Sequence, residues 1–306
     1  IVQALGIMEN FDLSAHKPSN PADEGGIPSV MGVHLVSEAE RLAYADRDKY
    51  VADTDFVSLP GLGVSSMLDK NYLKARAALI DPDGQSMGVA QAGVFDAASA
   101  KRAVDTTQEH GTTHYSIVDA YGNVASMTTT VESSMGSFHM VDGFLLTNQL
   151  TDFSAQPQDG DGNPVANRVE GNKRPRSTMA PTLVFKGTQP GDFLMATGSP
   201  GGGSIIQYVL KTVVGALDWG LDAQQATSLN DFGASNSRTT NVDGSNTTQD
   251  LSALIAGLQA KGHTVSTSAQ SSGISTIMRV SKDGAMKLEG GVDPRREGIV
   301  LGDGAL

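Results

Sequence analysis

The sequence contains no cysteine in its 306 residues. Disulfide bonds, thiolate metal ligands and cysteine nucleophiles are therefore all excluded. Aromatic residues amount to only 5%, so we expect a core packed mainly from aliphatic and small side chains. The most apolar stretch, around residues 209–216, is much shorter than the ~20 residues that a membrane-spanning helix needs. The net charge of −12 argues against nucleic-acid binding, because an acidic surface repels phosphates.

What is present indicates a sizeable folded core. The length is enough for one large α/β domain or two ordinary ones, and the 35 glycines indicate many tight turns and close backbone approaches. The first residues, IVQALGIMENFDL, have neither an initiator methionine nor a charged leader, and they begin in the middle of a helical pattern. We therefore expect the chain to be a piece of a longer protein.

The first third of the chain has the pattern of a helical scaffold. Residues 1–10 read as the tail of a helix, and apolar residues at helical spacing predict a long amphipathic helix over residues 29–50. The segment SLPGLGVSSMLDKNYLKARAALI predicts a turn followed by another helix. Residues 82–108 have weak periodicity and are typical of a connector. The segment 1–110 is thus predicted to be mainly helical.

From Thr112 onward the pattern changes to strands. THYSIVD and VASMTTT alternate polar and apolar residues around the turn AYGN, which predicts a hairpin. The other predicted elements are strands at 143–148 and 182–185, helices at 205–217, 221–229 and 251–261, a turn-rich polar stretch at 230–249, and a second hairpin turning at 282–284. Strands and helices in this order predict a layered α/β architecture with sheets inside.

Two threonines are predicted to meet at the open end of the first hairpin. With the turn centred on Tyr121, Thr112 lies nine residues before it and Thr130 nine after it. In a regular antiparallel hairpin these positions face each other. The threonines have two interpretations: they are good strand formers, or one of them reacts. Taken alone, a Thr-Thr-His run before a strand is more typical of ordinary structure.

A reacting threonine needs a base, and two candidates exist. His114 shares a strand face with Thr112, but at about 7 Å, which is too far for direct contact. The other candidate is the α-amine of Thr112 itself, freed by a cut before it, with a reference pKa near 8. Threonine with its own N-terminal amine is a known nucleophile–base pair. Gly111 permits the strained backbone that such a self-cleavage requires.

A glycine cluster at 201–203 opens an apolar helix in TGSPGGGSIIQYVL. Free backbone N–H groups at a helix start bind anions or a developing oxyanion. A phosphate-binding loop is disfavoured, because the Gly-Lys-Ser/Thr ending is missing.

Two further segments carry polar groups suited to an amino acid ligand. In NKRPRSTMAPT, Ser177 and Thr178 offer adjacent hydroxyls between prolines, a rigid pair that suits a carboxylate. In LLTNQLTDFS, Gln149 and Asp152 follow an apolar strand, and Asp152 suits an ammonium group. Each segment alone is typical of a turn or a helix cap.

Together these segments resemble the γ-glutamyltransferase family of N-terminal-nucleophile hydrolases. The resemblance runs in order through essentially the whole chain and is carried by EAERLAYADRDKYVADTDF, GTTHYSIVDAYGN, MTTTVESSMGS, GFLLTNQLTDFS, NKRPRSTMAPT, TGSPGGGSII and DPRREG. It implies an α/β fold, a four-layer αββα sandwich. It also implies that residues 1–111 are the C-terminal part of a large subunit and that residues 112–306 are the small, catalytic subunit.

The resemblance also implies an activity. The precursor would cut itself between Gly111 and Thr112, and Thr112 would then take a γ-glutamyl group from molecules such as glutathione and pass it to water, an amino acid or a peptide. The implied roles of the other residues are support of the amine by Thr130, oxyanion-hole amides from Gly201 and Gly202, α-carboxylate binding by Ser177 and Thr178, and α-ammonium binding by Glu132, Gln149 and Asp152. No cofactor or metal is implied, and the implied location is periplasmic or secreted.

The sequence departs from the family pattern at several points. Position 132 is Glu where some members have Asn, and Thr178 replaces a second Ser. Residues 155–172 form a shorter loop than the lid-bearing forms and lack their Tyr, while NDFGASNSRTTNV replaces a Pro-Arg-x-His stretch. The front half of the large subunit, with an arginine that grips the α-carboxylate, is missing and is an expected partner.

Two alternatives remain open. A related acylase would use the same nucleophile on glutaryl side chains or poly-γ-glutamate, and a non-catalytic homologue would serve as a binding protein. The set of Glu132, Gln149 and Asp152 favours a substrate with a free amine. Metal binding is not predicted, because the six histidines lack ligand spacing and DGDGN at 159–163 lacks the required positions of a calcium loop.

Overall fold

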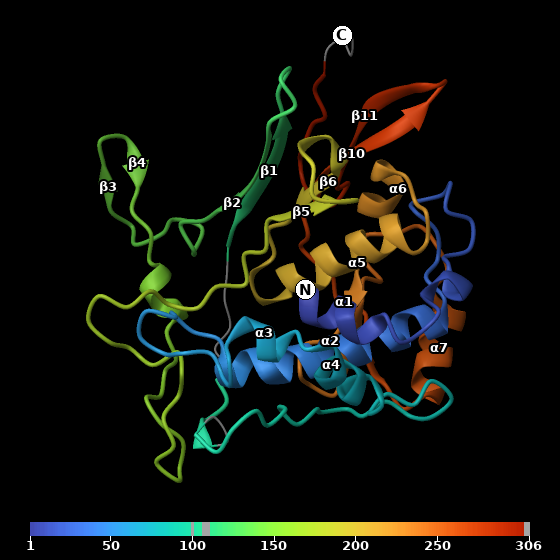
Figure 1. Ribbon diagram of the computed structural model, residues 1–306. Helices are drawn as coiled ribbons and strands as arrows, with labels where there is room; N and C mark the ends of the chain where they lie inside the picture. Colours follow the sequence, from blue (N-terminus) through green and yellow to red (C-terminus); the bar gives the residue numbers. More distant parts are fainter. Residues whose placement is uncertain (99–100, 106–110, 303–306) are drawn as a thin grey trace.

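The computed structural model describes residues 1–98, 101–105 and 111–302 (Figure 1). Two β layers meet face to face. One is the hairpin of β1 (Thr113–Val118) and β2 (Val124–Thr129), and the other is a four-stranded sheet in the order β11-β10-β6-β5, antiparallel throughout. The strands of that sheet are β5 (Thr182–Phe185), β6 (Phe193–Gly198), β10 (Ser275–Lys282) and β11 (Ala285–Val292).

Side-chain alternation along β6 assigns its two faces. Met195 is buried in the main core with helical residues, whereas a Cβ at Gly198 would lie 2.3 Å from the ring of His114 on the hairpin. Ser126 of the hairpin donates a hydrogen bond of 3.1 Å to the carbonyl of Thr197. The hairpin therefore covers one face of the sheet, and α5 and α6 cover the other.

The described residues contain seven α-helices. They are α1 (Val2–Met8), α2 (Val30–Tyr50), α3 (Val64–Met67), α4 (Lys70–Ala77), α5 (Ile205–Leu217), α6 (Ala223–Ser228) and α7 (Ser252–Ala260). Most match the predicted segments. In the described residues, no helix combines the length and the apolar character needed to cross a bilayer.

The long helix α2 differs from its prediction. It was expected to be amphipathic, but it is buried on nearly all sides, because α1, α7 and β7 (Phe232–Gly233) surround it. Its charged side chains are consequently paired inside the protein. Arg41 contacts Glu38 at 2.7 Å, and Asp46 contacts Arg76 of α4 at 3.4 Å. The charges between the apolar residues thus form interior ion pairs rather than a solvated face.

The two predicted subunits share a single core. Arg41 donates a 2.8 Å hydrogen bond to Thr240, and a carboxyl oxygen of Glu40 accepts one of 2.7 Å from the amide of Ala234. The main hydrophobic cluster likewise draws on both sides of Gly111. A cut at Gly111–Thr112 would therefore leave two chains interlocked in one body.

Several short strands were not predicted. The central strand β6 was missed, and the polar stretch 230–249 contains β7 and β8 (Thr239–Val242), which pairs with β9 (Thr264–Ser266). The predicted strand at 143–148 shrinks to β4 (Phe144–Leu145), which pairs with β3 (Met140–Val141). Strands of two to four residues depend on distant partners, so local alternation does not mark them.

Candidate active site

The first hairpin brings Thr112 and Thr130 together. The register pairs Thr113 with Thr129 and His114 with Thr128, so the next positions outward are 112 and 130, as predicted. The Thr130 hydroxyl donates a 2.6 Å hydrogen bond to the carbonyl oxygen of Gly111. The Thr112 hydroxyl contacts the same oxygen. Two hydroxyls therefore converge on the carbonyl of the peptide bond that precedes Thr112.

Only glycine fits at position 111. Its φ is +37°, and an added Cβ would lie 1.7 Å from the carbonyl oxygen of Glu132. Glu132 itself has a positive φ of 72°, a rare state for a side chain of this size. The amide of Glu132 donates a 2.7 Å hydrogen bond to the Thr130 hydroxyl. The backbone at the Gly111 carbonyl and at its neighbour Glu132 is thus tightly constrained and strained.

His114 points between the two β layers and away from Thr112. Its Nδ1 lies 2.8 Å from the Thr128 hydroxyl, and its Nε2 lies 3.2 Å from that of Ser116. Burial lowers its pKa to about 4. A neutral imidazole committed to these partners is a poor candidate for the base that activates Thr112.

The glycine cluster forms an amide-lined turn at the start of α5. Gly201 has φ +140° and Gly202 has φ +55°, and a Cβ at Gly201 would lie 2.3 Å from the ring of Tyr208. Within the described ranges, no acceptor is bonded to the N–H groups of Gly201 and Gly202. The turn continues into the 3₁₀ helix Gly202–Ser204. Two strained amides with free donors have the form of an oxyanion hole.

The two predicted carboxylate-binding hydroxyls are not equivalent. Thr178 is buried and donates a 2.7 Å hydrogen bond to the Gly202 carbonyl, so its proton is already used to hold the glycine turn. Ser177 is half-buried, and its oxygen accepts a 3.1 Å bond from the amide of Met179. Ser177 keeps its own proton for an acidic ligand, whereas Thr178 is better described as a support of the turn.

The predicted ammonium-binding residues lie on one connected stretch. The Glu132 carboxylate is buried and accepts hydrogen bonds from Ser133 at 2.7 Å and from Asn148 at 2.9 Å. The next residue, Gln149, starts a 3₁₀ helix that ends at Asp152, which is buried. Asn148 therefore ties Glu132 to the segment that carries the other two residues.

A second asparagine, which the sequence patterns missed, joins the ammonium and carboxylate segments. Asn167 donates to the Asp152 carbonyl at 2.8 Å and to the Asp105 carboxylate at 2.9 Å, and it accepts from the Arg176 amide at 2.8 Å. Arg176 immediately precedes Ser177. Asn148 and Asn167 carried no sequence signal beyond their positions beside polar residues, because their roles depend on contacts that form only in the folded chain.

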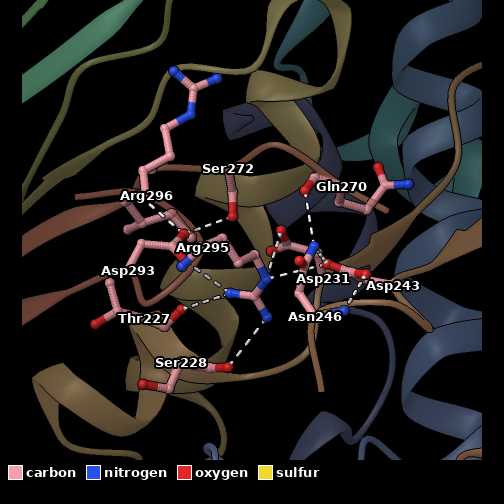
Figure 2. Close-up of polar contacts among 12 residues, drawn as sticks. Thr227, Ser228, Asp231, Asp243, Asn246, Gln270, Ser272, Asp293, Arg295 and Arg296 are labelled. Carbon is pink, nitrogen blue, oxygen red and sulfur yellow. Dashed lines mark hydrogen bonds and ion pairs between the residues drawn. The ribbon is translucent and has the colours of Figure 1, made fainter. Parts of the chain in front are cut away.

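Two residues of the DPRREG segment, Asp293 and Arg295, belong to a buried ionic cluster (Figure 2). Arg295 lies 3.4 Å from Asp231, 3.3 Å from Asp243 and 3.0 Å from Asp293. Asp293 in turn accepts a 2.6 Å bond from Ser272. The segment around Ser272 reaches the glycine turn through the amide of its neighbour Gly273, which donates to Ser199 at 3.1 Å.

A polar cavity of about 470 Å³ borders the glycine turn. Its volume is in the range of small-molecule sites. Its lining includes Thr178 and Gly201, together with Arg47, Asp48 and Asp105. Two of the predicted site residues thus border a space large enough for an amino acid derivative.

A buried cluster of His34, Glu38 and His263 has ligand-type atoms within 4.8 Å of one another. The two rings are in direct contact, with 2.8 Å between His34 Nδ1 and His263 Nε2. Their outer nitrogens contact the Asp81 carbonyl and the Thr240 hydroxyl. Protein groups therefore satisfy all four ring nitrogens, and the chemistry of the cluster does not require a metal ion.

Comparison with known proteins places these features in a family. The family model described as gamma-glutamyltranspeptidase matches residues 1–303. A glutathione hydrolase proenzyme of Escherichia coli strain K12 is 37% identical over 238 residues, which are 74% of this chain and 36% of that protein. The corresponding proenzyme of Bacillus subtilis strain 168 is 34% identical over 235 residues, again 74% and 36%. The chain thus spans about a third of the length of these relatives.

Solved structures agree in fold. The gamma-glutamyltranspeptidase T380A mutant of Helicobacter pylori is 30% identical, with a TM-score of 0.52 over 60% of this chain and 100% of that one. A cephalosporin acylase of Bacillus halodurans, 20% identical, gives a TM-score of 0.73 over 96% of this chain and 47% of that one, and shares the fold. The predicted α/β fold of the N-terminal-nucleophile hydrolases is confirmed, and the chain belongs to the gamma-glutamyltranspeptidase family.

Proposed function

We propose that this chain carries the catalytic centre of a γ-glutamyltransferase and glutathione hydrolase. Thr112 would attack the γ-glutamyl carbonyl and form an acyl-enzyme, which water, an amino acid or a peptide resolves. The single observation that carries the proposal is the convergence of the Thr112 and Thr130 hydroxyls on the Gly111 carbonyl. In this proposal, an acyl group bound to Thr112 would take the place of that carbonyl.

The first step in this proposal is self-cleavage of a proenzyme. In the uncut chain the Thr112 nitrogen is an amide and cannot act as a base. The Thr112 oxygen would attack the Gly111 carbonyl carbon, the carbon–nitrogen bond would break, and the nitrogen would take the hydroxyl proton. Water would then hydrolyse the ester and leave a carboxylate on Gly111. The Thr130 hydroxyl is aimed at the oxygen that becomes negative.

The proposed cut divides the protein into residues 1–111, from a large subunit, and 112–306, a small subunit. Thr112 would then start a chain, and its free amine would take the hydroxyl proton in each cycle and return it to the leaving amine. The amides of Gly201 and Gly202 would stabilise the oxyanion. Ser177 would donate to the substrate α-carboxylate, with Thr178 holding the turn.

The substrate ammonium group would be held by Glu132, Gln149 and Asp152. Two of these residues carry buried carboxylates, and negative charge in the site favours a donor with a free α-amine. The names of the relatives as proenzymes support self-processing. The front half of a large subunit remains an expected partner, and we propose a periplasmic or secreted location from the resemblance.

A second candidate function is that of an acylase. An acylase ACY 1 proenzyme of Pseudomonas sp. strain SE83 is 29% identical over 228 residues. This similarity is the observation that supports an acylase as the second candidate. The test compares γ-glutamyl-p-nitroanilide with glutaryl-p-nitroanilide, which lacks the amine. We expect the γ-glutamyl compound to be turned over at least about tenfold faster, the loss typical of one unmade charged hydrogen bond. Faster turnover of the glutaryl compound would establish the acylase, and no turnover of either would establish a non-catalytic homologue.

A further inference from the structure

Two adjacent arginines of the DPRREG segment point in opposite directions (Figure 2). Arg295 is held inside the cluster of three aspartates. Arg296 is exposed, and its side chain extends the other way. Its Nη1 donates to the main-chain carbonyl of Thr112 at 3.4 Å, and its Nε donates to the carbonyl of Ser271 at 3.1 Å. The Arg296 guanidinium group therefore contacts the main chain of Thr112, the residue that carries the proposed nucleophilic hydroxyl.

The stem of Arg296 also lies beside the glycine turn. A Cβ at Gly273 would meet the Arg296 Cδ at 2.8 Å and the Pro200 Cγ at 2.7 Å. Pro200 immediately precedes Gly201. The Arg296 side chain thus passes over Gly273, beside the glycine turn, and ends at the main-chain carbonyl of Thr112. Its position is set by the buried anchor of Arg295 one residue earlier.

Among the described residues, no carboxylate neutralises the Arg296 head group. Across residues 1–98, 101–105 and 111–302, its polar contacts are the two main-chain carbonyls, and no carboxylate forms an ion pair with it. A guanidinium has five N–H donors, so three remain directed at solvent. In a chain with a net charge of −12, an exposed unpaired cation beside the nucleophile is a site for an anionic group of the substrate.

We propose that Arg296 binds the carboxylate of the amine partner in γ-glutamyl transfer. The partner is an acceptor amino acid or peptide, or the equivalent group when it leaves from the donor. This inference rests on the proposed function. The α-carboxylate of the γ-glutamyl group already has the candidate Ser177 on the glycine-turn side. A planar guanidinium matches the second carboxylate in a two-point contact.

The step that Arg296 serves is the resolution of the acyl-enzyme. The acceptor nitrogen attacks the carbonyl carbon of the Thr112 ester, a carbon–nitrogen bond forms, and the bond from that carbon to the Thr112 oxygen breaks. The proton released by the acceptor nitrogen passes through the Thr112 amine to the Thr112 oxygen. Arg296 holds the acceptor's carboxylate so that its amine lies against the ester.

The test uses the natural full-length protein, γ-glutamyl-p-nitroanilide as donor, and two acceptors, glycylglycine and glycylglycinamide. The acceptors differ only in the terminal carboxylate. We expect Arg296→Gln to lower the ratio of kcat/KM for glycylglycine to that for glycylglycinamide about tenfold or more, as expected for loss of a charged hydrogen bond. Arg296→Lys should restore part of the ratio. The control is Arg279→Gln on β10, which makes the same change of charge away from Thr112 and should leave the ratio unchanged.

The ratio separates recognition from positioning. If Arg296 acts only by holding the Thr112 backbone, both acceptors slow equally and the ratio stays constant, which overturns the proposal. An unchanged rate with both acceptors overturns it as well. Failure of the wild-type protein to release p-nitroaniline would instead refute the proposed function. Active-site titration measures how much of each variant is correctly folded. Because a folding defect lowers the rates with both acceptors by the same factor, the ratio of the two kcat/KM values still tests the proposal.

Discussion

Gly111 offers the sharpest prediction at the scale of single residues. Gly111→Ala adds a Cβ that would lie 1.7 Å from the Glu132 carbonyl oxygen, in a backbone with φ +37°. The main chain would have to move, and the Gly111 carbonyl would lose its place under the two hydroxyls. We expect self-cleavage to slow by at least about a hundredfold, because a misplaced reacting group costs this much. The measurement is the rate of fragment appearance on a gel.

The matched control is Gly122→Ala, in the turn of the same hairpin. Gly122 also has a positive φ, +84°, but no atom lies within 4 Å of an added Cβ. This variant bears backbone strain without a collision, so it should cleave at close to the normal rate. Normal cleavage in Gly111→Ala would contradict the account of the site.

At the residue scale, contacts set by local spacing were predictable from the sequence. The spacing about Tyr121 was enough to bring Thr112 and Thr130 together, because hairpin register is set by the turn. The sequence could not reveal that Thr178 donates to Gly202 or that Asn167 joins distant segments. Those hydrogen bonds link residues brought together only by the tertiary fold.

At the scale of elements, the Arg295 cluster fixes the DPRREG segment. Arg295→Ala would leave Asp243 and Asp293 buried without their main counter-charge. Removing one partner from a buried ionic cluster typically costs about 3–5 kcal/mol. We expect a loss of this size in the free energy of unfolding, measured by urea denaturation.

The comparison variant for that experiment is Arg279→Ala on β10. Among the described residues, the polar partner of Arg279 is the carbonyl of Gly191, in an exposed contact, so its loss should cost about 0.5 kcal/mol or less. Equal, small effects of both substitutions would show that the Arg295 cluster does not stabilise the fold.

The elements themselves were predictable where local chemistry decides them. The second hairpin was expected with its turn at residues 282–284, and Asp283 and Gly284 do adopt positive φ between β10 and β11. Strand β6 was not predicted, although it lies at the centre of the sheet. Its FLMATG segment is buried on both faces and lacks alternation, so only its pairing with β5 and β10 makes it a strand.

At the scale of the whole molecule, buried titratable groups set the pH dependence of stability. Burial lowers the pKa of His114 to about 4 and that of His263 to about 3, and also lowers the pKa of His34. Below the ordinary histidine pKa of 6.5, these imidazoles bind protons in the unfolded chain but stay neutral in the folded chain. Stability should therefore fall as the pH drops from about 6.5 toward 4.

Glu40 acts in the opposite direction. Burial raises its pKa from 4.5 to about 8. Between these values the folded carboxyl keeps a proton that the unfolded one has lost, so its contribution is lost as the pH rises through 8. We expect stability to be greatest near pH 6.5, measured by urea denaturation from pH 4.5 to 9. Glu40→Gln should remove the alkaline decline and keep the acidic one; an unchanged alkaline decline would contradict this assignment.

The most direct test of the central claim is the identity of the residue that starts the catalytic fragment. Purified protein is incubated, and its fragments are examined by intact mass and N-terminal sequencing while γ-glutamyl-p-nitroanilide hydrolysis is followed. The account predicts a new chain beginning at Thr112, with activity rising in proportion to its amount. A chain that stays whole between Gly111 and Thr112 yet turns over the substrate would contradict it.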